Sequence, residues 1–85
     1  MSYGLSISRQ AKKEIKTLDT PTIKRIEDRF RQLADNPFDP RISKPIKMSP
    51  GRRTSRVGDW RIIYEVNESD TIVEVVSIWH RGKAY

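Results

Sequence analysis

The chain has 85 residues, a formal net charge of +6 and an isoelectric point of about 10.0, and 33% of its residues are charged. This length suffices for one domain, residues 1–85, with a single modest core. The chain contains no cysteine and one histidine, which excludes a disulfide framework and a thiolate zinc site. We expect no metal and no cofactor. Neither a signal peptide nor an apolar stretch of membrane-spanning length is visible, so we expect a cytoplasmic protein without a membrane partner.

The first forty residues predict a short strand followed by two helices. Residues 3–8 alternate weakly between apolar and polar side chains and indicate the strand. Ser8 can cap a first helix, and Thr20 as N-cap with Pro21 at the first helical position begins a second one that ends at Asn36-Pro37. The apolar residues of the first helix are Ala11, Ile15 and Leu18, and those of the second are Ile23, Ile26, Phe30, Leu33 and Ala34. Two amphipathic helices of this kind need a sheet to cover.

The second half predicts a loop and three strands. Residues 37–51 contain four of the five prolines and indicate a loop. Strands are expected at about 52–57, 60–66 and 71–79, with Gly58-Asp59 forming either a tight hairpin turn or a bulge. The last strand is too uniformly apolar for a sheet edge and is expected in the centre. The order β-α-α-β-β-β predicts an α+β domain, with both helices on one face of a mostly antiparallel four-stranded sheet.

Positive charge is concentrated in the middle of the chain. Within residues 41–61, Asp59 alone opposes seven basic residues. Such a patch attracts phosphates and steers them to the surface, and arginine suits bidentate phosphate contacts. A solvated basic face that serves solubility remains the alternative. The seven basic residues are Arg41, Lys44, Lys47, Arg52, Arg53, Arg56 and Arg61.

Arg61 is the residue of this patch that strand alternation singles out. If Ile63 faces the helices, Arg61 shares that side and needs either an anion or a carboxylate partner there. The functional interpretation is a phosphate site, to which Arg56 could also reach across the hairpin. The structural interpretation is a salt bridge from Arg61 to Asp59 or Glu65. Both stay open at this point.

His80 and Tyr85 are the residues near the basic cluster that could exchange protons, although a lone histidine is more often a structural hydrogen bonder. No carboxylate pair, nucleophilic triad, phosphate-cradling glycine loop or metal motif is present. The chemistry that fits is metal-free attack of an RNA 2′-hydroxyl on the adjacent phosphate, which needs proton transfer and cations. The basic residues expected to contact the RNA backbone are Arg52, Arg53, Lys44, Lys47 and Lys83.

Two motifs carry a family resemblance. Arg56–Tyr64 (RVGDWRIIY) resembles the R-x-G-D-Y-R-(I/V)-(I/V)-Y core of the RelE/ParE superfamily of toxins from toxin–antitoxin modules, with Trp60 in place of the usual tyrosine. His80–Tyr85 (HRGKAY) is similar to the terminal H-R-x-x-x-Y motif of that superfamily, and Ser8–Ile15 is similar to the opening of its first helix. The resemblance spans nearly the whole chain and agrees with the predicted order of elements.

The resemblance implies a toxin that cuts mRNA in the decoding site of the ribosome, with contacts to 16S rRNA, and that a cognate acidic antitoxin inactivates. Promoter DNA would be bound only through the antitoxin complex. By motif match, Arg61 and Arg81 would stabilise the phosphate, and Tyr85 or His80 would move protons. Arg56 and Arg52 would act as the basic residues of the first hairpin strand, whereas Thr54 departs from the family because a basic residue is common there.

The same motifs leave two other functions open. ParE-type members share much of the pattern and poison DNA gyrase without nuclease activity. A basic nucleic-acid-binding module without catalysis is the third interpretation. The motifs therefore identify the fold better than the target.

Overall fold

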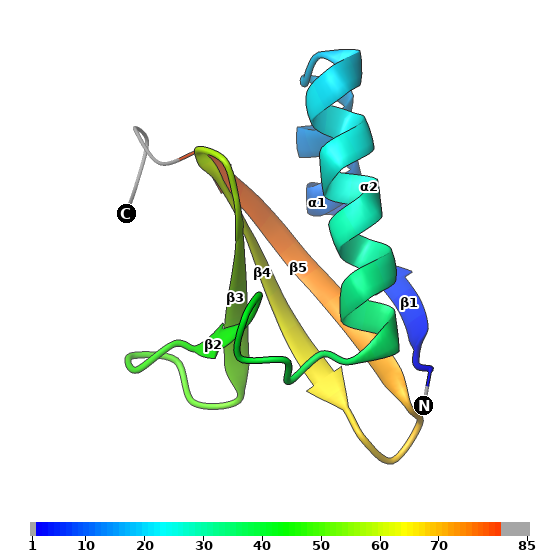
Figure 1. The fold of residues 1–85 in the computed structure, drawn as a ribbon, viewed down its shortest axis with the longest axis vertical. Helices are drawn as coiled ribbons and strands as arrows, with labels where there is room; N and C mark the ends of the chain where they lie inside the picture. Colours follow the sequence, from blue (N-terminus) through cyan, green and yellow to red (C-terminus); the bar gives the residue numbers. More distant parts are fainter. Residues whose placement is uncertain (1, 81–85) are drawn as a thin grey trace.

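A computed structural model describes residues 2–80, in which two helices lie on one face of a twisted sheet (Figure 1). The predictions for Arg81, Lys83 and Tyr85 therefore lie outside the described residues. None of the helices in the described part of the chain is long and apolar enough to cross a membrane. The elements in chain order are β1 (Gly4–Ile7), α1 (Arg9–Lys16), α2 (Thr20–Asp35), β2 (Lys44–Pro45), β3 (Arg52–Val57), β4 (Trp60–Asn67) and β5 (Ile72–His80).

The sheet has five strands in the order β1-β5-β4-β3-β2, with β1 parallel to β5 and the other neighbours antiparallel. The predicted central position of β5 is confirmed, and so is the α+β class. The predicted number of four strands is wrong, because residues 44–45 of the expected loop pair with β3. Two residues are too few to show alternation, and Pro45, which lacks an N–H, fits a strand only at a sheet edge.

Ser8 caps α1 as predicted and also fixes this helix to β5. Its hydroxyl accepts from the Ala11 amide at 3.0 Å and donates to the Val76 carbonyl at 2.6 Å. Glu14 adds a second attachment, since its Oε1 accepts from the Ile78 amide at 2.8 Å. The Val76 carbonyl and the Ile78 amide both lie beside a bulge in the β4–β5 pairing, where the register shifts between Ile63 and Tyr64.

The second helix begins one residue earlier than predicted. Thr20 is already helical and Asp19 is the N-cap, so the assignment of Thr20 as N-cap is wrong by one position. The Asp19 carboxylate accepts from the Thr22 hydroxyl at 2.5 Å rather than from a backbone amide. Pro21 stays in the first turn, where its missing N–H removes no helical hydrogen bond.

The core lies between the helices and one face of β4 and β5. Ile62 and Tyr64 of β4 are fully buried in it. The other residues of this core include Ile26, Phe30 and Leu33 of α2 and Val73, Val75 and Ile78 of β5. Ile63, which the sequence left open as a residue facing the helices, therefore lies on the other side of the sheet. Residues 62–64 are all apolar, so their pattern alone could not decide the face. We call the opposite side of the sheet, which carries Arg61 and Ile63, the open face.

Candidate functional site

The β3–β4 hairpin builds the centre of the candidate site. Gly58 begins its two-residue turn with φ of +60°, so the hairpin interpretation of Gly58-Asp59 is confirmed. A Cβ at Gly58 would also lie 3.2 Å from the guanidinium of Arg25 on α2. The hairpin register places Arg56 directly opposite Arg61.

Two rows of side chains cross the open face. Arg56 on β3, Arg61 on β4 and Trp79 on β5 form the first row, because Arg61 pairs with both of the others. The structure thus brings together two of the predicted catalytic arginines and adds an indole that sequence reasoning missed. Because successive side chains of a strand point to opposite faces, an inward-facing Ile78 places the next residue, Trp79, on this face. The second row consists of Thr54, Ile63 and Ser77.

A hollow of about 660 Å³, which we call the main hollow, lies over these rows. Apolar side chains of β4 and β5 and of the loop after β2 line it, and Arg61, Arg52 and Lys47 supply positive charge. The Trp79 indole also lines it and donates from Nε1 to the Ser77 hydroxyl at 2.7 Å. A hollow that combines cations with aromatic and apolar surface can hold a nucleotide, with its base stacked and its phosphate paired. The apolar lining residues are Ile46, Met48, Ile63 and Val76.

Arg52 contributes less free charge than its position suggests. Its Nε lies 2.9 Å from Oε2 of Glu65, its cross-strand neighbour on β4. Both side chains are 43% exposed, so solvent screens the pair and its contribution to stability is small. Breaking this ion pair would therefore cost Arg52 little free energy.

Arg53 lies on the other side of the sheet, although sequence analysis grouped it with the RNA contacts. Its Nε donates to the Ser43 hydroxyl at 2.8 Å and its guanidinium lies 5.2 Å from the centre of the Phe38 ring. Ser43 is hydrogen-bonded to the buried Tyr64 hydroxyl, which donates to the Pro37 carbonyl at 2.7 Å. These contacts, which we call the loop network, attach residues 37–43 to the sheet and keep Arg53 away from the open face.

His80 is also separated from Arg61. Its ring contacts Trp60 edge-on, with centroids 4.7 Å apart and an interplanar angle of 72°. Trp60 packs against the core on the helix-bearing face, so alternation along β5 places Trp79 over the main hollow and His80 on the opposite side.

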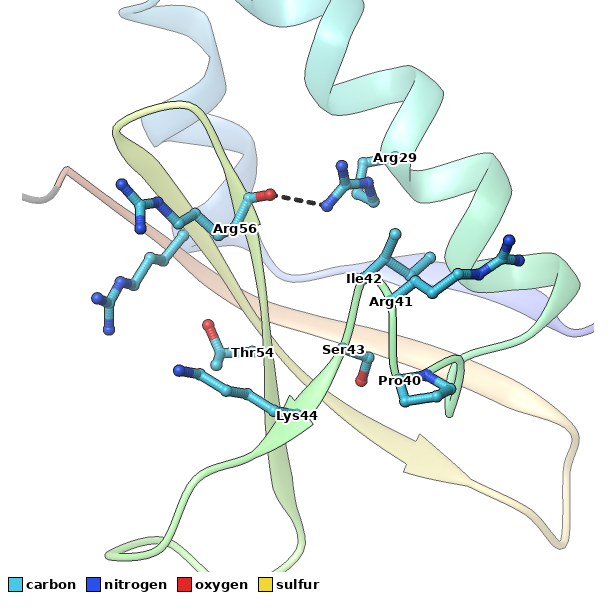
Figure 2. Close-up of a pocket in the computed structure, with 9 residues that line it drawn as sticks. Arg29, Pro40, Arg41, Ile42, Ser43, Lys44, Thr54 and Arg56 are labelled. Atoms are coloured by element: carbon cyan, nitrogen blue, oxygen red, sulfur yellow. Dashed lines mark hydrogen bonds between the residues drawn. The ribbon is translucent and has the colours of Figure 1, made fainter.

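A second hollow of about 240 Å³, the edge hollow, lies beside the outer edge of β3 (Figure 2). Arg29 of α2 reaches its wall, and Nη1 of Arg29 donates to the Ser55 hydroxyl at 2.8 Å and to the Arg56 carbonyl at 2.7 Å. Arg29 carries no signal of this role in the sequence, because an arginine on the polar side of an amphipathic helix looks like a solvated charge. The cationic residues that line the edge hollow are Arg29, Arg41, Lys44, Arg56 and Arg61.

One ion pair lies at the rim of this region. Arg41 binds both carboxylate oxygens of Asp39, with Nη2 2.9 Å from Oδ2 and Nε 3.2 Å from Oδ1. The hydrogen bond from the Arg41 side chain lowers the pKa of the Asp39 carboxyl below its ordinary value. Within residues 2–80, no three histidine, aspartate or glutamate side chains gather where they could hold a metal ion.

Comparison with known proteins identifies the family by a sequence model and the fold by similar structures. Residues 5–85 match the sequence model of the family described as ParE toxin of type II toxin–antitoxin system, parDE. The structure is similar to the archaeal RelE–RelB complex from Pyrococcus horikoshii OT3, with 24% identity, a TM-score of 0.83, and coverage of 99% of this chain and 100% of that one. It is also similar to the toxin–antitoxin complex RelBE2 from Mycobacterium tuberculosis, with 21% identity, a TM-score of 0.83, and coverage of 95% and 100%.

A third similar structure is the isolated E. coli RelE toxin, with 16% identity, a TM-score of 0.83, and coverage of 98% of this chain and 88% of that one. At these identities the structural likeness establishes the fold alone. No curated protein sequence matches the chain.

Proposed function

This chain belongs to the ParE toxin family of type II toxin–antitoxin systems, and we propose that it is a toxin of the RelE kind, a ribosome-dependent endoribonuclease that cuts mRNA in the decoding site. The observation that carries this proposal is the row of Arg56, Arg61 and Trp79 beside the main hollow. Two cations next to an aromatic surface suit one nucleotide and its phosphate.

The proposed reaction is a transesterification within the RNA. The 2′-hydroxyl attacks the adjacent phosphorus and loses its proton to a base, while the bond from phosphorus to the 5′ oxygen breaks and that oxygen takes up a proton. The products are a 2′,3′-cyclic phosphate and a 5′-hydroxyl. Arg61 and Arg56 would bind the non-bridging oxygens, on which negative charge increases in the transition state.

Two further roles come from the resemblance of the terminal motif. Arg81 would add a third cation at the phosphate, and Tyr85 or His80 would transfer protons. Because the His80 ring contacts Trp60 on the helix-bearing face, we assign the proton transfer to Tyr85. Lys47 and Arg52, which line the main hollow, would hold the flanking RNA, and Lys83 is proposed to join them.

The partners follow from the same family. We propose that a cognate acidic antitoxin inactivates this toxin by covering the open face, where positive charge makes association fast and salt-sensitive. Two of the similar structures are complexes of a toxin with its antitoxin. Binding to promoter DNA is proposed only for the antitoxin complex.

A second candidate function is inhibition of DNA gyrase. The family whose model matches is named after the ParE toxin. This family name supports the gyrase alternative as directly as it supports a nuclease. The two functions differ in target, so one pair of assays separates them.

The test is induced expression followed by mapping of mRNA 5′ ends on ribosomes, with a gyrase supercoiling assay on the purified protein. We expect new 5′-hydroxyl ends within codons held in the decoding site and unchanged supercoiling. Inhibited supercoiling without new mRNA ends would replace the nuclease with the gyrase function. New ends that carry a 5′-phosphate would contradict the proposed transesterification.

A further inference from the structure

We propose that the edge hollow is a second phosphate site, which binds the phosphodiester next to the one that reacts. This inference rests on the proposed function, since it assigns the neighbouring linkage of the same RNA strand. The site would hold the strand in register rather than take part in bond cleavage.

The charge of the edge hollow is the first argument. Its five cationic side chains come from α2, the loop before β2, and strands β2, β3 and β4, and none of its lining residues is acidic. Among the interactions formed within residues 2–80, none engages the Lys44 ammonium, whereas Arg41 is paired with Asp39. Figure 2 shows the Lys44 and Arg56 side chains on the same side of the hollow, with Arg41 directed away from them. Cations gathered in a hollow whose lining contains no acidic residue favour an anion between them.

A buried hydroxyl in the wall of the edge hollow also favours a bound anion. Thr54 is 7% exposed, and its Oγ1 has no hydrogen-bond partner within the described part of the chain. A buried hydroxyl without a partner destabilises a protein, so such a group calls for an explanation. Lys44 is the cross-strand neighbour of Thr54, and both line the edge hollow. A phosphate oxygen bound there would accept from this hydroxyl and satisfy it.

The position of the edge hollow shows which phosphate it would bind. Thr54 and Arg61 line both the edge hollow and the main hollow, so the two hollows adjoin. An RNA strand with its reacting phosphate at Arg61 would leave the main hollow across Thr54. The next linkage along the strand then reaches Lys44.

Arg29 makes this site rigid before any ligand arrives. The pairing of β2 with β3 ends at Thr54, which leaves the β3 edge beyond it without a strand neighbour. Arg29 takes that place through its bonds to the Ser55 hydroxyl and the Arg56 carbonyl. The wall of the edge hollow and the backbone of Arg56 are therefore held by the same side chain.

The experiment measures single-turnover cleavage on ribosomes programmed with short mRNAs. One mRNA is all phosphodiester, and two others carry a neutral methylphosphonate linkage on the 5′ or the 3′ side of the cleaved one. We expect one of the two neutral linkages to slow the wild-type toxin roughly tenfold, as expected for loss of one charge-assisted contact. Lys44→Ala should slow cleavage of the normal mRNA by a similar factor and cause no further loss on the mRNA with that neutral linkage.

Lys24→Ala is the matched control, because Lys24 is an exposed lysine of α2 that lines neither hollow. It should cleave all three mRNAs as the wild type does. Thr54→Val supplies an independent readout, since it removes the hydroxyl with little change in volume. We expect Thr54→Val to raise the melting temperature and to slow cleavage, a combination that a purely structural role would not produce.

The outcomes separate the second site from the proposed function. If Lys44→Ala slows cleavage equally on normal and neutral-linkage mRNA, the bound phosphate belongs to ribosomal RNA and the assignment to the substrate strand is wrong. If Lys44→Ala and Thr54→Val both cleave at the wild-type rate, the second site does not exist while the nuclease stands. If the wild-type protein leaves ribosome-bound mRNA intact, the proposed function fails and the second site fails with it.

Discussion

Arg52 and Arg53 are adjacent in sequence, but they lie on opposite faces of β3 and have different surroundings. Arg53 belongs to the loop network, where the Ser43 hydroxyl and the Phe38 ring contact its guanidinium. Arg52 lies on the open face beside the main hollow and forms one half-exposed ion pair with Glu65. Within one strand, the face that a side chain occupies decides whether an arginine stabilises the fold or can bind a ligand.

The difference extends to the two regions as a whole. In the loop network, every polar group named above has a partner inside the protein, and the Tyr64 side chain is fully buried. On the open face, Arg56 and Arg61 lie directly opposite each other, and an anion bound beside them would reduce the repulsion between their like charges. Changes in the first region should therefore affect stability, and changes in the second should affect activity.

Arg61→Ala should have the largest effect. Loss of one preorganised cation at the phosphate lowers a cleavage rate by about 10²–10³-fold, and we expect the melting temperature to change little. We expect the same loss of cleavage rate from Arg81→Ala, because Arg81 matches the arginine of the terminal H-R-x-x-x-Y motif. Growth inhibition and mRNA cleavage on ribosomes are the measurements, and Arg31→Ala, an exposed arginine of α2 paired with Asp28, is the control. Full toxicity from a folded Arg61→Ala, Arg81→Ala double variant would rule out the nuclease.

Tyr64→Phe tests the loop network. The substitution removes the hydroxyl that joins Ser43 to the Pro37 carbonyl, and an unsatisfied buried polar group costs about 1–3 kcal/mol of unfolding free energy. For a chain of this length, each kcal/mol lowers the melting temperature by about 4–8 °C. Urea denaturation checks the value, and the cleavage rate of the folded fraction should equal that of the wild type. A large loss of activity at unchanged stability would show that the loop network belongs to the active site.

Arg52→Gln and Arg53→Gln sharpen the comparison, because the same substitution is made at neighbouring positions. Arg53→Gln should lower the unfolding free energy by about 1–2 kcal/mol, through its hydrogen bond and its contact with Phe38, and leave cleavage unchanged. Arg52→Gln should change stability by less than about 0.5 kcal/mol and reduce cleavage several-fold. Equal effects of the two variants on cleavage would show that the face of the strand does not separate their roles.

The smallest expected effect is a pH dependence at the Asp39–Arg41 pair. The folded state lowers the pKa of Asp39, so the pair contributes stability above the ordinary carboxyl pKa of 3.8, and this contribution is lost as the pH falls through the lowered value. Asp39→Asn should abolish that part of the pH dependence and lower the melting temperature slightly at pH 6, where the contribution of the pair is fully present; the effect is small because the Arg41 side chain is 86% exposed and solvent screens the pair. Melting temperatures of both proteins between about pH 2 and pH 6 provide the measurement. A larger difference between them at pH 6 than at pH 2 agrees with this sign, and the reverse contradicts it.

The sequence by itself determined the elements that local chemistry specifies. The Ser8 cap, the central position of β5 and the α+β class were predicted from residue patterns within single elements and are confirmed. For Gly58-Asp59 the sequence left a hairpin turn and a bulge open, and the structure has the hairpin turn. The motif that contains Arg56 and Arg61 is visible in the sequence, and the two-residue turn then places these two arginines opposite each other.

Only the tertiary structure decided which face each strand presents and which distant residues meet. The run from Ile62 to Tyr64 is apolar on both faces, so contact with α2 and the loop network was needed to turn Ile62 and Tyr64 inward and to leave Arg61 on the open face. The short strand β2 forms because Lys44 and Pro45 pair with β3, and Arg29 lines the edge hollow because it reaches β3 from α2. These contacts join residues far apart in the chain, so local sequence patterns do not predict them.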